Sequence, residues 1–230
     1  METFTGYGVM GLTFDSGHVL GLRCWHRSSI GPPYTSVWHR DPGGRWAFWS
    51  TAEAGVSCSR YVGELAQRAE VADVAVEWHG ERRLVVTMAV PDLRWEVDLA
   101  PTVTARLLTA AARRLPAPLL ARPAVLRALG PAAGWLLRTG PLALTGRMPN
   151  GQGFRLVPCS VVAVRASRAR LGGVDLGLPA PLPVQAAIGG FRIPQRGLLA
   201  VGEVSFEPLD PARHSTRLSR RPAPSSAPRC

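Results

Sequence analysis

The chain has 230 residues, enough to bury a full hydrophobic core as one large β domain or as two small ones. All 27 basic residues are arginine, and the formal net charge is +11. Because the chain contains no lysine, chemistry through a lysine imine, such as acetoacetate decarboxylation, is excluded.

The four cysteines, Cys24, Cys58, Cys159 and Cys230, are far apart and form no CxxC pair. This spacing argues against a metal site or a disulfide framework. The first residues lack a basic stretch followed by an apolar one, and no run of about 18 apolar residues occurs. We therefore expect a cytoplasmic protein that uses neither a metal nor a cofactor.

The positive charge is concentrated in the middle of the chain. Residues 99–174 hold eleven arginines and no acidic residue, whereas the segments on either side nearly cancel each other. This basic segment suits a membrane surface, an anionic ligand or simply a solvated face. Only two aromatic residues, Trp135 and Phe154, lie within it and no recognition motif appears, so we expect no nucleic-acid partner.

The first hundred residues predict successive β-hairpins. Apolar runs at 7–14 and 18–26 flank DSG, runs at 35–39 and 45–50 flank DPGG, and runs at 73–78 and 83–90 flank HGER. Residues 93–100, LRWEVDLA, alternate between apolar and charged side chains, as expected of a half-buried strand.

The apolar period then changes to that of a helix. Residues 101–116 and 122–140 predict two short amphipathic helices with arginine on the polar side, the second broken near Gly130–Pro131. Strands resume with a hairpin centred on Asn150–Gly151, two runs that meet at Gly172–Gly173, and a last strand at 197–208.

These elements predict a mainly β protein, an antiparallel up-and-down β-barrel of about 8–10 strands with an inserted pair of short amphipathic helices. We expect a single domain over residues 1–208, with the helical insertion at 101–140. The polar, proline-rich residues 209–230 predict a disordered basic tail.

Three stretches, GRMPNGQGFRLVP (146–158), VRASRARLGGVDLG (164–177) and FRIPQRGLLAVGEVSFE (191–207), resemble lipocalin-like (calycin) proteins. Within that group the resemblance is to AttH-like proteins related to carotenoid hydratases, tocopherol cyclases and lipocalin-like pericyclases. It implies a barrel that holds hydrophobic, often terpenoid or polyketide-like molecules. Many such relatives have two domains, so no active-site position is transferred from them.

Three residues are candidates for catalysis. Glu203 lies on an otherwise apolar strand, and inside a barrel its raised pKa would let it donate a proton; it could instead point outward. His39 is either an acid or base beside Trp46 or a solvated residue at a hairpin end. Tyr34, held by two prolines, either donates to a developing oxyanion or caps the core.

The hairpin across DPGG is expected to pair residue 40 with 45 and 39 with 46. This register places His39 with Trp46 on one face and Trp38 with Trp49 on the other. Candidate substrate-binding residues are the aromatic residues and one arginine of the apolar strands and helices: Arg23, Trp38, Trp46, Trp49, Trp95 and Trp135.

Two classes of function fit this picture. One is a cofactor-independent cyclase, isomerase or hydratase that acts on a hydrophobic small molecule inside the barrel. The other is a non-catalytic carrier of a hydrophobic or anionic ligand. A third alternative is an adaptor that binds a membrane surface through the basic helices. No residue pattern determines the oligomeric state.

Overall fold

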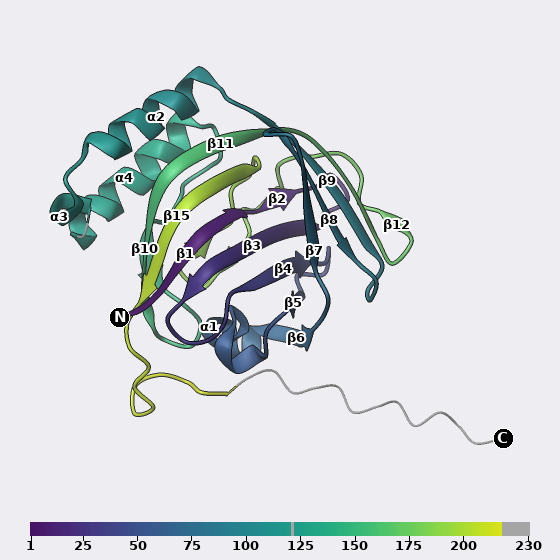
Figure 1. Ribbon diagram of the computed structural model, residues 1–230, viewed down its shortest axis with the longest axis horizontal. Helices are drawn as coiled ribbons and strands as arrows, with labels where there is room; N and C mark the ends of the chain where they lie inside the picture. The colour runs from purple at the N-terminus through teal and green to yellow at the C-terminus, as the bar shows by residue number, and fades with distance from the viewer. Residues whose placement is uncertain (121, 218–230) are drawn as a thin grey trace.

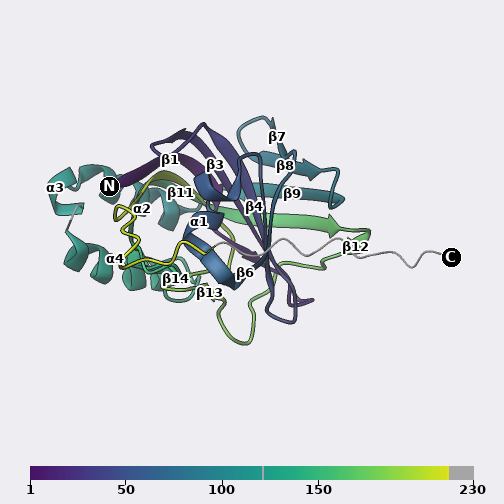
Figure 2. The same ribbon diagram turned by 90° about the horizontal axis from the view of Figure 1, so that it is seen from below.

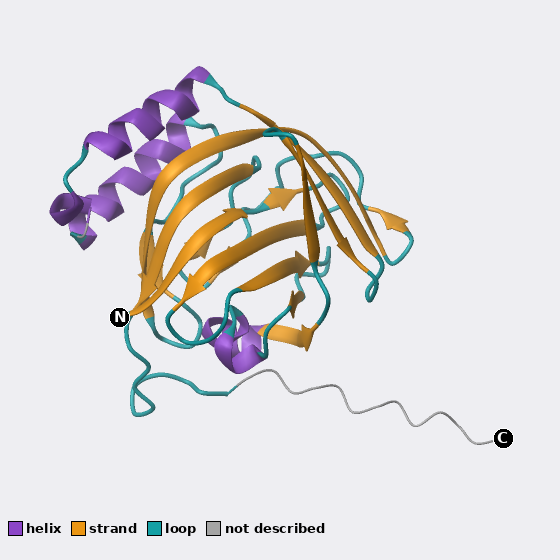
Figure 3. Ribbon diagram, in the orientation of Figure 1, coloured by secondary structure: helices purple, strands orange, loops and turns teal. Residues whose placement is uncertain are grey.

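The computed structural model describes residues 1–120 and 122–217, and its main feature is one strongly curved β-sheet (Figure 1; Figure 3). The principal strands run in the order β6-β5-β4-β3-β1-β15-β11-β9-β8-β7. Their bounds are β1 Glu2–Val9, β3 Val19–Ser28, β4 Tyr34–Arg40, β5 Trp46–Ser50, β6 Ala66–Val71, β7 Ala75–His79, β8 Arg83–Met88, β9 Leu93–Ala100, β11 Gly153–Leu171 and β15 Leu198–Phe206.

The shorter elements lie at the margins of this sheet. They are β2 Leu12–Thr13, β10 Thr145–Arg147, β12 Val174–Asp175, β13 Ala187–Ile188 and β14 Phe191–Arg192, with helices α1 Ser59–Val62, α2 Val103–Arg114, α3 Ala117–Leu120 and α4 Pro123–Leu136 and 3-10 turns η1 Ala54–Val56 and η2 Gly63–Leu65. Three helices therefore lie between β9 and β10, in the segment where the sequence predicts a pair.

The sheet is not closed into a barrel. Its two ends, β6 and β7, do not pair with each other in the part of the chain that the structure describes. The long strands otherwise follow one another around the sheet in chain order, with β1 beside the last strand β15, and the parallel β5–β6 pair is the departure from an up-and-down arrangement. The mainly β prediction is confirmed, whereas the closure implied by the hairpin count and by the calycin resemblance is not found.

Strand β11 joins the two halves of the sheet. Its residues 154–163 pair with β15, and its residues 163–171 pair with β9 on the opposite edge. Register shifts at Pro158–Ser160 and Val164–Ala166 interrupt the pairing, and such bulges bend a strand and increase its twist. The two strands predicted here are therefore one bent strand of 19 residues.

The curvature lays the β7–β9 half of the sheet across the half that contains β3 and β4 (Figure 1; Figure 2). Apolar side chains from both halves fill the space between them, among them Phe14, Leu20, Leu22, Trp49, Leu84, Trp95 and Val97. A second core on the other face of β3–β5 contains Phe4, Tyr34, Trp38, Phe48, Phe191 and Phe206. The interior of the curved sheet is therefore packed, and it is not the hollow lumen that a barrel would offer.

Helix α4 continues through the predicted break. Pro131 lies inside it, while Gly130 and Gly134 are buried against the segment 140–144. A Cβ at Gly130 would lie 2.5 Å from the carbonyl oxygen of Leu142. The glycines thus let this segment cross the helix closely, and this tertiary contact explains why the Gly–Pro pair does not end the helix.

Residues 209–217 pack on the protein, unlike the tail expected there. The backbone N–H of Ser215 donates to the carbonyl oxygen of Asn150 at 2.9 Å, and His214 is buried. Residues 218–230 lie outside the described part of the chain. Among the described residues, none of the helices has the length and apolar character needed to cross a bilayer.

The β4–β5 hairpin has a register one residue away from the predicted one. Arg40 pairs with Trp46, His39 with Ala47 and Trp38 with Phe48. Gly44 has φ +89° and adds one residue between the turn and β5. The backbone N–H of Gly44 donates to the carbonyl oxygen of Asp41 at 2.9 Å. Because strand side chains alternate, this one-residue shift moves Trp46 to the face of Trp38 and leaves His39 with Trp49.

We expect Gly44→Ala to lower the free energy of unfolding by about 1–2 kcal/mol, because a left-handed conformation is strained for any residue with a Cβ. Urea unfolding followed by circular dichroism measures this loss. Gly55→Ala is the control, since Gly55 has an ordinary φ and open space around it. Equal stability of the two variants would show that the left-handed residue does not set the turn.

Candidate functional site

A cavity of about 240 Å³ lies beside the sheet, under the helices. It occupies the edge of β11 at residues 156–161, which β9 does not reach because the β9 pairing begins only at residue 163. Helix α2 covers this edge, where the backbone N–H of Val161 donates to the Thr109 hydroxyl at 3.1 Å. The lining is almost entirely aliphatic and includes Leu108, Leu115, Leu126, Leu129, Leu137, Leu156 and Ala200.

Two smaller pockets, of about 40 and 20 Å³, adjoin this cavity. All three share Met10 and Leu156 in their linings, so they meet around Met10. Gly6, Gly8 and Gly202 lie in the strands beside these pockets, where a Cβ would lie 2.0, 2.1 and 2.3 Å from the carbonyl oxygens of Cys24, Leu22 and Val157. Glycine in a strand interior often marks the close approach of another backbone, and here it lets the strands pack closely beside the pockets.

Arg23 lies at the inner end of these pockets and is only 3% exposed. Its guanidinium donates to the carbonyl oxygens of Val9 and Leu22 at 2.7 Å each, and it lies 4.1 Å from the centre of the Trp38 ring. No described carboxylate forms an ion pair with it. Burial lowers the pKa of Arg23 to about 10, so the side chain remains a cation at neutral pH.

The other polar groups at this end are mostly hydrogen-bond donors. The Cys58 sulfur lies 3.4 Å from the Tyr34 hydroxyl and 3.5 Å from Trp25 Nε1, and a thiol is a weak acceptor. Burial raises the pKa of the Cys58 thiol and raises the pKa of the Tyr34 phenol well above its ordinary value, so both stay neutral. The Trp38 N–H forms no hydrogen bond of ordinary geometry with a described residue, although it affects the Cys58 pKa.

We name this end of the cavity the donor pocket; it comprises Arg23, Trp25, Tyr34, Trp38 and Cys58. Two indoles and a phenol have one weak sulfur acceptor among them there, beside a cation that donates to backbone carbonyl oxygens. Such an excess of buried donors is matched best by a ligand that brings acceptors, above all an anion.

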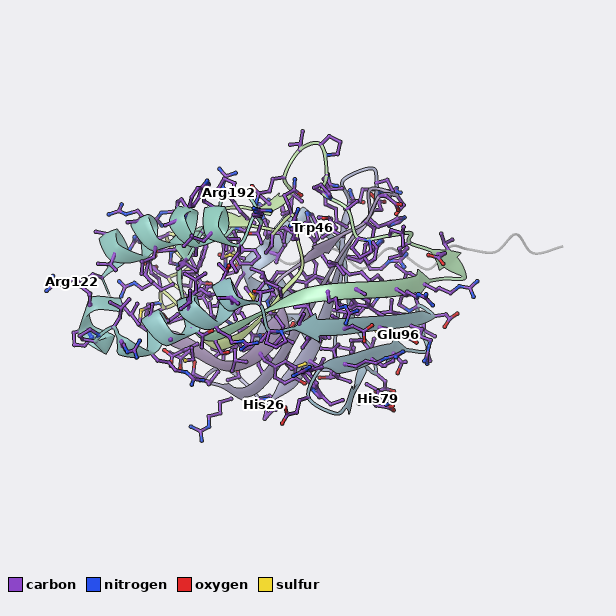
Figure 4. The ribbon with its side chains drawn as sticks, turned by 90° about the horizontal axis from the view of Figure 1, so that it is seen from above. His26, Trp46, His79, Glu96, Arg122 and Arg192 are labelled. Carbon is purple, nitrogen blue, oxygen red and sulfur yellow. The ribbon has the colours of Figure 1, made fainter. Side chains whose placement is uncertain are left out.

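The structure brings together three of the residues singled out from the sequence, Arg23, Tyr34 and Trp38. Trp46 lies behind them in the same core, packed on Phe48, which contacts Trp38 (Figure 4). Among the described residues, Arg23 has no acidic side chain as a partner.

His39, Trp49 and Trp95 lie elsewhere, in the core between the two halves of the sheet. His39 Nε2 lies 2.8 Å from His18 Nδ1, and its ring stacks on those of His18 and Trp49. Burial, with a smaller contribution from His18, lowers the pKa of His39 to about 4. His39 is therefore neutral at neutral pH, rather than titrating there as the sequence suggested. The Trp95 N–H donates to the Ser167 hydroxyl at 2.9 Å, which is a structural role.

Glu203 and Trp135 are exposed. Glu203 alternates along β15 with Gly202 and Val204, which face the pockets, so its own side chain points to solvent at the pocket margin. It therefore lies outside the apolar interior that its candidacy as a proton donor required. Trp135, on α4, does not line the cavity.

Sequence reasoning missed Met10, Trp25, Cys58 and Phe191. Cys58 and Phe191 come from loops and short elements whose position depends on tertiary contacts. One signal was available in the strand stretches GYGVMG (6–11) and AVGE (200–203), where glycine recurs inside apolar runs.

No family model matches the chain, and no curated protein matches it. Among solved structures, a crystal structure of acetoacetate decarboxylase from Legionella pneumophila is similar with a TM-score of 0.41 and 9% sequence identity. The match covers 88% of this chain and 83% of that one. A likeness at this level carries no information about activity or substrate.

The His18–His39 contact predicts that the free energy of unfolding falls as pH falls from about 6.5 to about 4. The reason is that the histidines bind protons in the unfolded chain over this range, whereas the buried pair stays neutral. Asp41 favours protonation of both rings but does not offset their burial. His39→Phe should reduce this loss by at most about 3 kcal/mol. Urea unfolding at neutral pH and at about pH 4 tests it.

The control is His79→Gln, because His79 is exposed at the end of β7 and should leave the pH dependence unchanged. If His39→Phe and the unmodified protein lose stability equally on acidification, the histidine pair does not cause the loss.

Proposed function

We propose that the protein binds an apolar small molecule that carries one terminal anionic group, of which a carboxylate is the simplest. The anion would lie in the donor pocket against Arg23, Tyr34 and Trp38. The apolar part would extend past Met10 into the cavity under the helices. The observation that carries this proposal is a buried guanidinium with no acidic partner at the inner end of an apolar cavity.

Energetics favours this interpretation over a structural role for Arg23. Burying a cation costs several kcal/mol unless it is paired, and the carbonyl oxygens of Val9, Leu22 and Met10 compensate only in part. An apolar residue at this position would fill the core at lower cost. A bound carboxylate supplies the missing counter-charge and accepts from the guanidinium, the phenol and the indole at once.

The shape of the cavity supports an apolar remainder of the ligand. Its lining offers few polar atoms, those of Thr109, Ser160 and Arg192 among them. Moving hydrocarbon from water into such surroundings contributes about 25 cal/mol for each Å² buried, whereas a polar group there would lose its hydrogen bonds to water. A fatty or isoprenoid acid combines both requirements in one molecule.

We expect the unmodified protein to bind decanoic acid more tightly than decanol in calorimetric titration. Arg23→Met should weaken binding of the acid by about 2 kcal/mol, or about 30-fold, because the charged hydrogen bonds are lost. Binding of the alcohol should change little. Arg27→Met, on the same strand but exposed, is the matched control for the loss of one positive charge.

A second variant tests the apolar part of the site. Ala200→Leu places extra carbon where two of the pockets meet and should weaken the acid and the alcohol alike. Thermal unfolding verifies that each variant is folded. If the unmodified protein binds neither ligand, or if Arg23→Met weakens both to the same extent, the proposal is wrong.

A second candidate function is turnover of such an acid by cofactor-independent cyclisation, isomerisation or hydration. The observation that favours it is Tyr34, a neutral phenol that has only a thiol as its hydrogen-bond partner and is held close to a cation. A phenol so placed can donate its proton to a developing anion. The two functions share the donor pocket and differ only in whether the bound molecule changes.

The two candidates are separated with farnesoic acid as the probe and mass spectrometry with chromatography as the readout. A carrier returns the acid unchanged. An enzyme yields an isomer or a hydrate, and Tyr34→Phe should abolish that product while leaving binding within a few-fold of the unmodified protein.

A further inference from the structure

The helices α2–α4 and the residues that follow them, 102–138, form a cap that projects from one end of the sheet (Figure 1; Figure 2). Its turn at α3 lies farthest from the strands, and Arg122 points outward there (Figure 4). This helical cap contains no acidic residue. Its arginines are all exposed and form no ion pair with described residues: Arg106, Arg113, Arg114, Arg122, Arg127 and Arg138.

Large apolar side chains are exposed on the same cap. Trp135 is 79% exposed, Val103 70% and Leu107 67%. Val103 and Leu107 are one turn apart on α2, and Trp135 continues an exposed face of α4 that is otherwise formed largely by alanine. The outer face of a helix in a globular protein is normally polar, so this face is unusual for a surface in contact with water alone.

We propose that the helical cap docks on the surface of an anionic lipid bilayer. Trp135, Leu107 and Val103 would enter the boundary between headgroups and acyl chains, where indole rings are favoured. The arginines would lie at the level of the lipid phosphates and contact them, because their long apolar stems let the charge reach the headgroups.

Charge complementarity favours an anionic membrane over the other occupants of such a face. A second copy of the chain would bring two sets of arginines together, and like charges repel. The arginines would bind the phosphates of a nucleic acid, but the exposed aliphatic side chains would then have no partner. A bilayer satisfies the apolar and the cationic groups together.

The cap also forms one wall of the cavity. A groove of about 540 Å³ between α2 and β11, lined by Arg106, Arg113 and Arg114, adjoins the cavity at Thr109 and Val161. If the proposed function holds, docking brings this groove to the membrane, where an apolar acid is concentrated. The docking itself does not depend on the cavity being a binding site.

The test is sedimentation of the full chain with lipid vesicles. We expect binding to phosphatidylcholine vesicles that contain about 30% phosphatidylglycerol, little binding to phosphatidylcholine alone, and release as salt screens the charges. The double variant Trp135→Ser, Leu107→Ser and the double variant Arg122→Glu, Arg127→Glu should each lower the affinity by about tenfold or more. All four side chains are exposed, so neither change should disturb folding.

Two matched controls lie outside the cap. Val184→Ser removes an exposed aliphatic side chain, and the double variant Arg82→Glu, Arg27→Glu reverses two exposed charges; both should bind vesicles like the unmodified protein. Arg23→Met should also bind them normally, and the cap variants should still bind decanoic acid. Failure of docking is thus distinguishable from failure of the proposed ligand site.

Three results would overturn the proposal. The first is equal binding to neutral and anionic vesicles, and the second is cap variants that bind as well as the controls. The third is a concentration-dependent dimer in analytical ultracentrifugation that Trp135→Ser abolishes, which would assign the apolar face to a second copy of the chain.

Discussion

The cavity exists because β15 and β9 are offset along β11. β15 pairs with residues 154–163 of that strand, and β9 pairs only with residues 163–171 on the other edge. Over residues 156–161, no principal strand therefore pairs with the edge of β11 that β9 occupies farther along. Exposed strand edges are normally covered, and here the chain leaves β9 as helices that return over the gap. The helical insertion thus forms one wall of the cavity.

Burial of Arg23 restricts what this cavity can be for. A cation at this depth is costly even with three carbonyl oxygens around it, and the Trp38 ring adds only a modest attraction. Two small pockets adjoin the guanidinium. Unfilled space next to a costly charge is a poor arrangement for stability and a suitable one for binding an anion.

Sequence patterns predicted the strands, the helical segment and three residues of the donor pocket, because these depend on local periodicity. These predictions were wrong where a single residue determines on which face of the sheet a side chain lies. Gly44 shifts the β4–β5 register, so Trp46 and Trp49 exchange sides relative to His39. They also failed where distant segments meet: the offset on β11, the fit of Gly130 against Leu142, and the approach of Cys58 to Tyr34 are set by tertiary packing.

Charged side chains are concentrated at the cap and become few toward the inner end of the cavity. The cap carries arginines without acids, three of these arginines line the groove, the cavity is nearly free of charge, and the inner end holds a single cation. Among the residues that line the three pockets, Glu203 is the acidic one, and its side chain points to solvent. Under the proposed function, an anion in the donor pocket would meet no repelling group there, and no described carboxylate forms an ion pair with Arg23. That absence is what keeps the donor pocket available to a ligand.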